Sequence, residues 1–420
     1  MNLLRHSKSY NFLYGFMTLI PHKPRRICHN HLNSKHDFSV CKMKALGDKV
    51  SFSGWALPPA RQPCRMAATK VIIDTDPGTD DALALFMALE AHRRGCVQVL
   101  AITTVHGNTS IENANNNVLR ILRLTDSLDI PVYSGAARPL VHLYIRDEEP
   151  FHGQDGFGDA DLPPQPPAAS LLQPQHAVTA LLDLASRHSG EVVLMGLGPL
   201  TNLALAMRLD PAFTSHLAGL YIMGGNSSGV GNITPFAEFN FYCDTDAAFI
   251  VLEEAGIPIR LTPFEICLKD GAIPYSVRQE LGRTKTAAAD LMNKIEVGIL
   301  KQKEYASWVT CDQMAMAWFI DEAKNKRLEG EGRKENGLEA AGGFLEERGK
   351  PLVTLTKSCY ATVNTKSELT DGRMMLAPER GQMVVDHEDR LGLKHNVVLL
   401  EGVDTSVYMK YLKMAFGADV

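Results

Sequence analysis

The chain has 420 residues, of which 45% are hydrophobic and 22% are charged, and its formal net charge is -5. This composition is typical of a globular protein with a large core, and it excludes a disordered or fibrous chain. The acidic balance argues against a nucleic-acid partner, because nucleic-acid-binding surfaces carry basic stripes that displace counterions from phosphate.

The N-terminal part is basic: residues 1–36 contain lysines and arginines but no Asp or Glu. The apolar run at residues 12–20 is too short to span a bilayer, so no membrane partner is expected. We expect residues 1–66 to form an extension that is either disordered or a targeting segment, ahead of a domain at residues 67–420. The eight cysteines are scattered without a CxxC pair, which favours a reducing, cytoplasmic location, with mitochondrial import as the alternative that the basic N-terminus leaves open.

From Lys70 onward, short β-branched apolar runs alternate with helical stretches, which predicts an α/β fold with a mainly parallel, Rossmann-like sheet flanked by helices. In such sheets ligands bind at the carboxyl ends of the strands, where loops lead into helices. The predicted strands cover residues 71–74, 97–103, 191–195, 219–223, 257–261 and 396–400. The predicted helices cover residues 80–93, 111–124, 176–187, 200–208, 245–255 and 312–323.

A dense cluster of carboxylates follows the first predicted strand, in the run Val71-Ile-Ile-Asp74-Thr-Asp76-Pro-Gly-Thr-Asp80-Asp81. Gathering several like charges at one strand end is costly unless a cation or hydrogen-bond donors compensate them. Oxygen ligands without His or Cys favour calcium or magnesium over zinc. The alternative, that these residues only cap the following helix, requires no more than one or two carboxylates.

An Asp-x-Asp motif after the first strand also occurs in a second class of enzymes. Phosphatases of the haloacid dehalogenase superfamily also carry Asp-x-Asp after a first strand and use the first Asp as a nucleophile, which here would be Asp74. The Pro-Gly after Asp76 and the Asp80-Asp81 pair depart from that pattern. The rest of the chain decides between the two classes.

The run from Asp74 to Leu85 resembles the signature of the inosine-uridine preferring nucleoside hydrolase family, and further family-like blocks follow in the same order. These blocks are Val105-His-Gly-Asn108, His152-Gly-Gln-Asp-Gly-Phe-Gly, Gly196-Leu-Gly-Pro-Leu-Thr-Asn202, Met223-Gly-Gly, Ala237-Glu238-Phe-Asn240 and Cys311-Asp312. The resemblance covers about residues 70–325 and resumes from Tyr360 to the C-terminus. It implies a single domain with the nucleoside hydrolase fold.

The resemblance also implies a reaction and a metal site. The reaction is hydrolysis of the N-glycosidic bond of a ribonucleoside to free base and ribose. A calcium ion would be held by Asp76, Asp81, the backbone carbonyl of Leu197 and Asp312, with a water and ribose hydroxyls completing a shell of oxygens. Asp76 is implied to deprotonate the calcium-bound water.

Ribose recognition is implied for a further set of polar residues. They are Asp80, Asn108, Asn232, Glu238, Asn240 and Asp312. Of these, Asn232 and Glu238 would hold the 5'-hydroxyl, while the 2'- and 3'-hydroxyl region would be held by Asp80 with the other two Asn residues. Each Asn alone would equally suit a turn. His152, also expected to contact substrate, lies in a Gly-rich stretch that looks like a flap closing over the site.

Protonation of the departing base is where the chain departs from the family pattern. The best-known members carry His immediately before the last Asp, and here that position is Cys311. A thiol has an unperturbed pKa of about 8.5, against about 6.5 for His, so it is a weaker acid for this step. The predicted catalytic residues are therefore Asp76, Asn240 and Cys311, with a small buried residue as the alternative for Cys311. A catalytically silent, calcium-dependent binder of nucleoside or ribose is the second hypothesis.

Two C-terminal segments interrupt the pattern. Residues 322–350 are rich in charged residues and Gly and predict a solvated insertion or flexible helix. Residues 367–383 look as if a short stretch interrupts a family-like Glu-Leu-Thr-Arg-Gly-Gln-Met, a lengthening that loops tolerate. Contacts to the base are expected from residues 301–308 and the flap, and the family habit implies a homodimer or homotetramer.

Overall fold

The computed structural model describes residues 68–142, 150–164, 168–302, 306–330, 344–345, 349–370 and 373–418. The extension predicted for residues 1–66 lies outside the described residues, as do residues 331–343 and 346–348 of the predicted insertion. Across the described ranges, none of the helices is long and apolar enough to cross a membrane.

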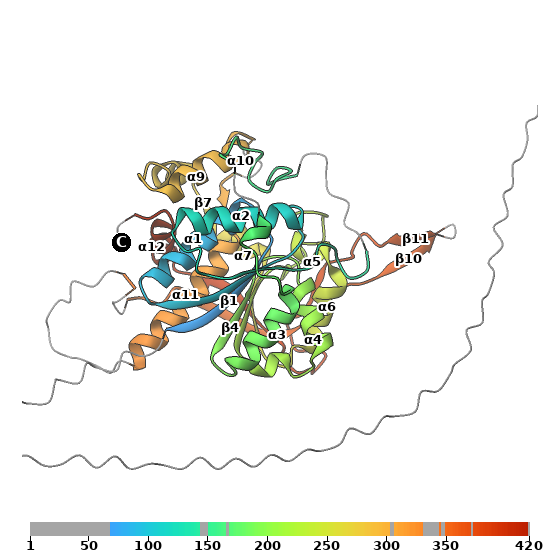
Figure 1. Cartoon of the computed structure of the whole chain (residues 1–420). Coiled ribbons are helices and arrows are strands. Elements are labelled where there is room, and N and C mark those ends of the chain that lie inside the picture. Colours follow the sequence, from blue (N-terminus) through green and yellow to red (C-terminus); the bar gives the residue numbers. More distant parts are fainter. Residues whose placement is uncertain are drawn as a thin grey trace, which may run out of the picture. The chain divides into compact units, whose positions relative to one another are not determined.

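A nine-stranded sheet forms the centre of the domain, in the order β12-β9-β13-β6-β5-β4-β1-β2-β3 (Figure 1). Neighbours from β3 to β13 pair in parallel, whereas β9 is antiparallel to both β13 and β12. The strands are β1 (Thr69–Thr75), β2 (Val97–Thr104), β3 (Val132–Ser134), β4 (Val192–Gly196), β5 (Leu217–Met223), β6 (Ile259–Thr262), β9 (Val353–Val363), β12 (Met383–Asp386) and β13 (Val397–Val403). The predicted mainly parallel sheet is thus confirmed, and each predicted strand is present with slightly shifted ends.

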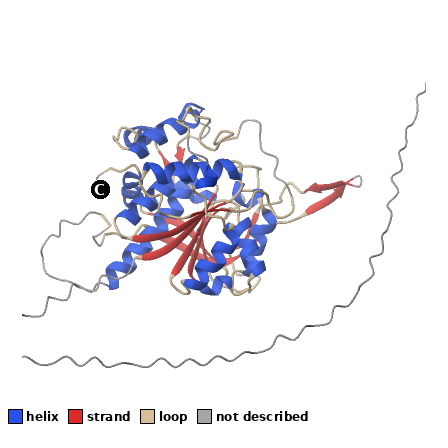
Figure 2. Ribbon diagram, in the orientation of Figure 1, coloured by secondary structure: helices blue, strands red, loops and turns tan. Residues whose placement is uncertain are grey.

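Helices cover both faces of this sheet (Figures 1 and 2). One face carries α1 (Thr79–Arg93), α2 (Ile111–Leu124), α11 (Asp312–Gly330) and α12 (Thr405–Ala415). The other carries α3 (Ala177–Arg187), α4 (Thr201–Leu209) and α6 (Thr245–Glu254). The shorter elements are α5 (Phe239–Cys243), α7 (Phe264–Lys269), α8 (Tyr275–Leu281), α9 (Ala287–Ile295) and α10 (Val297–Gln302), with the paired β7 (Ala272–Ile273) and β8 (Trp308–Val309).

Two apolar clusters fill the spaces between the sheet and its helices. In β1, Val71 and Ile73 belong to the first cluster and Ile72 to the second, as expected for side chains that alternate across a strand. Helix α1 is apolar on nearly every side, because it packs against α11, α12 and α9 as well as the sheet. This burial holds the first turn of α1 against the sheet edge.

The last helix predicted from the sequence continues to Gly330, into the segment 322–350. Lys324 is only 1% exposed, and its Nζ lies 3.3 Å from Asp321 Oδ1 and 4.6 Å from the centre of the Phe344 ring. The first part of the segment is thus a helix, one of the two forms expected, and its buried cation has a carboxylate and an aromatic face as partners.

The interruption predicted in residues 367–383 forms a hairpin of its own. Strands β10 (Ser367–Thr370) and β11 (Arg373–Leu376) pair antiparallel and project from the main sheet in Figure 1. At its base, the Asn364 N–H donates to the Gln382 carbonyl and the Gly381 N–H donates to the Asn364 carbonyl, both at 2.9 Å. These bonds close the chain across the hairpin, so that β9 and β12 pair without a break.

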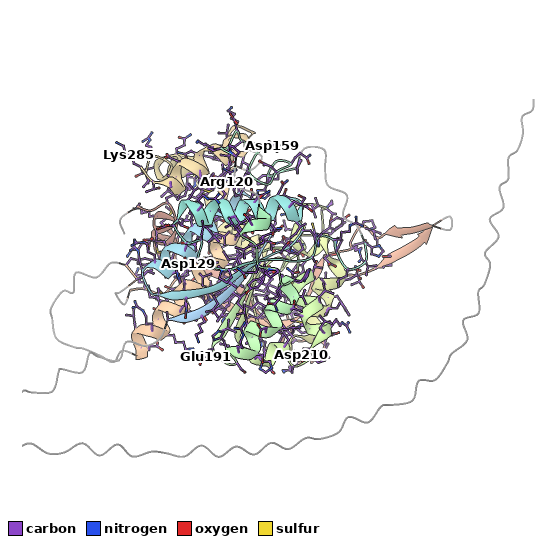
Figure 3. All side chains as sticks on the ribbon, viewed as in Figure 1. Arg120, Asp129, Asp159, Glu191, Asp210 and Lys285 are labelled. Carbon is purple, nitrogen blue, oxygen red and sulfur yellow. The ribbon has the colours of Figure 1, made fainter. Side chains whose placement is uncertain are left out.

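The carboxyl ends of three central strands, β1, β2 and β4, meet at one edge. Asp76 follows β1, Asn108 follows β2 and Leu197 follows β4. Figure 3 shows Asp159, from a loop at this edge, on the opposite side of the domain from Glu191, which precedes β4. The polar motifs of the sequence therefore gather where ligands bind in α/β sheets.

Candidate active site

Three carboxylates meet at this edge. Ligand oxygens of Asp80, Asp81 and Asp312 lie within 4.8 Å of one another. The first two occupy the first turn of α1 and the third begins α11, and these helices pack together. Helix N-termini favour negative charge, but Asp81 and Asp312 are 0% and 2% exposed, so water does not screen their repulsion. The arrangement is a candidate cation site.

Asp76 lies in a cradle of glycines beside this group. A Cβ atom on Gly107 would lie 2.0 Å from Asp76 Oδ2, and one on Gly198 would lie 2.4 Å from Oδ1. The Asn108 N–H donates to Oδ2 at 2.7 Å, whereas Oδ1 is buried and finds no hydrogen-bond partner among the described residues. A buried carboxylate oxygen without a donor calls for a ligand, and a cation or a water molecule fits.

Burial raises the pKa of these acids. It raises the pKa of Asp81 to about 7, with the charge of Asp80 as the next cause. The pKa of Asp76 and that of Asp312 lie well above the usual range, again through burial first and then through neighbouring carboxylates. A cation held among them would favour the charged forms. The all-oxygen donor set fits a hard divalent ion such as calcium or magnesium.

These shifts predict how stability depends on pH when no cation is bound. Folding raises the pKa of Asp81 from 3.8 to about 7, so within that window the folded state holds more protons than the unfolded chain. The free energy of unfolding contributed by Asp81 therefore falls as pH rises. We expect the Tm of chelator-treated protein to fall less steeply across this window in Asp81→Asn than in the wild type. Equal slopes in thermal melts would contradict the assignment.

Two predicted site residues, Leu197 and Asn240, are hydrogen-bonded to each other. Asn240 Nδ2 donates to the Leu197 carbonyl oxygen at 2.8 Å and to the Met223 carbonyl oxygen at 3.2 Å. These carbonyls end β4 and β5, so the amide ties two strand ends together. The Leu197 oxygen keeps a second lone pair and the Asn240 Oδ1 is left as an acceptor, and both residues line the cavity.

Glu238 and Asn232 line the same cavity. Glu238 is 2% exposed and caps α5: Oε1 accepts from the Asn240 N–H at 2.9 Å, and Oε2 accepts from the Gly225 N–H at 2.7 Å. Burial raises the Glu238 pKa to about 7, against the effect of these donors. Asn232 Oδ1 accepts from the Phe239 N–H at 2.8 Å, which holds its side chain next to α5.

His152 is held over the start of α1. Its Nδ1 lies 3.2 Å from the backbone nitrogen of Thr79 and 2.9 Å from Thr79 Oγ1. Because Nδ1 accepts the backbone N–H, the proton of the neutral ring is on Nε2, which lies 3.6 Å from Asp80 Oδ1. The predicted flap is anchored here, since Asn117 Nδ2 donates to the carbonyl of Asp155 at 2.9 Å.

Cys311 also lines the cavity and lies beside the thiol of Cys267. This contact and burial raise the Cys311 pKa well above that of an ordinary thiol. The neighbouring Cys267 belongs to α7 and is completely buried. Cys311 therefore lines the cavity as a thiol that holds its proton more tightly than an ordinary one does.

The cavity has a volume of about 600 Å³ and would accommodate a drug-sized or nucleoside-sized ligand. Ser307 and Trp308 line it, from the segment expected to contact the base, whereas Lys301 is exposed and does not. Several lining residues were not singled out from the sequence. Among them are Phe264, Tyr275 and Glu296, which carry aromatic or charged side chains. Phe264 closely follows β6, so the rule that placed the other motifs at strand ends would also have found it.

Asp74, the nucleophile of the phosphatase alternative, is poorly placed for attack. It is completely buried and is not among the residues that line the cavity. Its Oδ1 accepts from Thr103 Oγ1 at 2.5 Å and from Asn202 Nδ2 at 2.8 Å. This geometry favours a structural role for Asp74 and speaks against the phosphatase.

Comparison with curated proteins finds relatives among nucleosidases. Uridine nucleosidase 1 of Arabidopsis thaliana is 39% identical over 183 residues, 43% of this chain and 52% of the relative. The inosine-uridine preferring nucleoside hydrolase of Leishmania major is 37% identical over 256 residues, 60% of this chain and 79% of the relative. A Schizosaccharomyces pombe protein, uncharacterized protein C1683.06c, is 40% identical over 198 residues, 47% of this chain and 61% of the relative. The matched regions thus span about half to four fifths of these relatives.

Among solved structures, nucleoside hydrolases have the same fold, and the aligned region covers almost the whole of each known chain. The chain superposes on an inosine-guanosine nucleoside hydrolase with a TM-score of 0.67 at 29% identity, over 84% of this chain and 99% of that one. For a plant nucleoside hydrolase, PpNRh1, the TM-score is 0.65 at 25% identity, over 83% and 98%. The model of the family described as inosine-uridine preferring nucleoside hydrolase matches residues 71–410. The chain therefore belongs to the inosine-uridine preferring nucleoside hydrolase family.

Proposed function

We propose that this chain hydrolyses the N-glycosidic bond of ribonucleosides with the help of a calcium ion. The observation that carries the proposal is the meeting of Asp80, Asp81 and Asp312 beside one nucleoside-sized cavity. The ion would be held by Asp81, Asp312, Asp76 and the Leu197 carbonyl, since hard divalent cations favour such oxygens. When bound, the ion would lower the pKa of a water molecule and attract the vicinal hydroxyls of ribose.

Asp76 is the base that would take the proton of the attacking water. Its Oδ2 is fixed by the Asn108 N–H, whereas Oδ1, without a donor among the described residues, is available as an acceptor. In the step, the water oxygen bonds to the anomeric carbon and the carbon–nitrogen bond breaks. The electron pair of that bond leaves with the nucleobase. The nucleobase takes up one proton from solvent while Asp76 releases the one it accepted, so that nucleoside and water give ribose and the free nucleobase.

Amide oxygens would support both the hydroxyls and the developing charge of the sugar. Asn240 uses its Nδ2 on two carbonyls, so its Oδ1 is left for the ring or its hydroxyls. Asn108 likewise donates its Nδ2 to Asp81 Oδ2 at 3.1 Å, which leaves its Oδ1 as an acceptor. Oxygens around the ring stabilise an oxocarbenium-like transition state. Asp80 would bind the 2'- or 3'-hydroxyl, and Asn232 with Glu238 the 5'-hydroxyl.

The substrates proposed are nucleosides of the kind named for the relatives, uridine and inosine. The test is the release of free ribose from inosine, uridine, adenosine, guanosine and cytidine, measured with calcium and with a chelator. We expect release from at least one nucleoside with calcium and its loss with the chelator. No release from any of them would overturn the proposal, and release that resists chelation would overturn the metal assignment.

A calcium-dependent nucleoside binder with little activity is the second candidate, and the raised pKa of Cys311 favours it. Cys311→His introduces a group with a pKa of about 6.5 next to the site. General acid catalysis contributes about 10²- to 10⁴-fold. We expect the variant to release ribose from inosine no more than about tenfold faster than the wild type if hydrolysis is the native activity. A rise approaching the upper figure would instead favour the binder.

A further inference from the structure

The loop between β5 and α5, residues 226–237, reaches the cavity through Asn232 and Ile233. The loop is tightly folded: a Cβ on Gly231 would lie 2.0 Å from the Thr234 carbonyl oxygen. The Asn232 N–H donates to the Ala237 carbonyl at 3.1 Å. Asn232 is itself exposed, so besides the bond from the Phe239 N–H its position depends on what fixes the loop.

One carboxylate, that of Glu265, fixes the first half of this loop. Its Oε2 accepts from the Ser227 N–H at 2.7 Å. Its Oε1 accepts from the Ser228 N–H at 2.7 Å and from the Val230 N–H at 3.3 Å. The hydroxyls of both serines are also within 3.2 Å of this carboxylate. A turn of backbone N–H groups that converge on one anion holds it firmly, since each bond is charge-assisted.

Glu265 is carried by a well-supported element. It lies in the first turn of α7, where the Phe264 N–H donates to the Gly225 carbonyl at 3.0 Å. Phe264 lines the same cavity, and Cys267, one turn further on, is completely buried. The carboxylate therefore joins the loop to α7, the helix that also places Phe264 in the cavity wall.

Other hydrogen bonds also hold the loop, but they do not connect it to α7. Asn226 Nδ2 donates to the carbonyls of Val230 and Phe236, at 3.1 and 2.6 Å, which closes the loop on itself. Asn226 Oδ1 accepts from the Met383 N–H at 3.0 Å. These contacts hold the loop to β12 and to itself, whereas Glu265 joins it to the wall that carries Phe264.

We propose that Glu265 is a positioning residue for recognition of the sugar's 5'-hydroxyl, acting by holding residues 227–230 so that Asn232 faces the cavity. The inference rests on the proposed nucleoside hydrolysis and assigns no chemistry to Glu265 itself. Its effect should appear with substrates that carry a 5'-hydroxyl and vanish with substrates that lack it.

The kinetic test compares Glu265→Gln with the wild type on the best ribonucleoside substrate and on its 5'-deoxy analogue. The Gln side chain has the same shape as Glu but only one acceptor oxygen. Some of the backbone N–H groups of residues 227–230 therefore lose their acceptor. We expect kcat/KM to fall about tenfold on the ribonucleoside, mostly through KM, and to change little on the 5'-deoxy analogue. Glu253→Gln is the matched control: this exposed Glu accepts from Tyr360 Oη at 2.8 Å, and its loss should change neither value. An equal fall on both substrates, or no fall, would overturn the inference.

Hydrogen exchange of the backbone amides tests the anchor without turnover. In Glu265→Gln, the amides of Ser227, Ser228 and Val230 should exchange faster, while those of β5 should not change. Unaltered exchange would overturn the anchoring role. If wild-type protein releases no ribose, the proposed function and the 5'-hydroxyl role fail together, and exchange alone then decides whether Glu265 holds the loop.

Discussion

Asp76→Asn is expected to lower kcat for ribose release by about a thousandfold, the middle of the range for loss of a general base. Asn has nearly the same volume, so it still fits the cradle of Gly107 and Gly198. Its amide oxygen still accepts from the Asn108 N–H, but no atom of the neutral amide takes a proton from water at neutral pH. The chemical step should therefore fail while the fold persists.

The measurement is a ribose assay at saturating substrate, paired with a thermal melt. Asp290→Asn, at an exposed Asp on α9 that does not line the cavity, should retain wild-type kcat. The Tm of Asp76→Asn without calcium should be no lower than that of the wild type, because burial and the charge of Asp81 disfavour the ionised Asp76. A kcat within about tenfold of the wild type would show that another group accepts the proton.

The elements predicted from the sequence were those with a strong local signal. β1 is an unbroken apolar run with Asp76 just behind it, and both clusters of the core begin from its alternating side chains. β9 was missed because its first half alternates poorly: it is antiparallel, lies near the sheet edge and has Leu355 54% exposed. A strand of this kind is defined by its partner β13 more than by its own residues.

The meeting of Asp80 and Asp81 with Asp312 could not be derived from local sequence patterns. Asp80 was expected on the ribose, Asp81 on the metal and Asp312 on both, and the structure gathers ligand oxygens of all three within 4.8 Å of one another. Whether Asp80 contacts ion, sugar or both stays a prediction. The meeting with Asp312 depends on how α11 packs against α1, and no spacing in the sequence encodes that packing.

Glu296 was missed for a similar reason. It follows α9 with no strand end beside it, and its Oε2 accepts from Arg278 Nε at 2.6 Å while its Oε1 accepts from Trp308 Nε1 at 3.0 Å. Three segments must fold together before this buried ion pair exists. The Cys267–Cys311 contact is equally hidden, since neither cysteine has a neighbouring partner in the sequence.

Asp312→Asn is expected to abolish the rise in Tm that calcium gives the wild type. A ligand present at about a hundred times its Kd stabilises the folded state by about 2.7 kcal/mol. For a domain of this size that corresponds to a rise of about 4 °C. Without calcium, the variant should be at least as stable as the wild type above neutral pH, because burial and three other carboxylates disfavour the charge of Asp312.

Asp321, on the same helix and equally buried at 2% exposure, is the contrasting control. Its carboxylate accepts from Tyr411 Oη at 2.7 Å and from the Leu352 N–H at 2.9 Å, and it pairs with Lys324. Asp321→Asn should therefore lower the Tm by a similar amount with and without calcium, since it leaves buried donors poorly satisfied. Should Asp312→Asn behave in the same way and keep the calcium-dependent rise, Asp312 would be a structural residue and the ion would have to be held elsewhere.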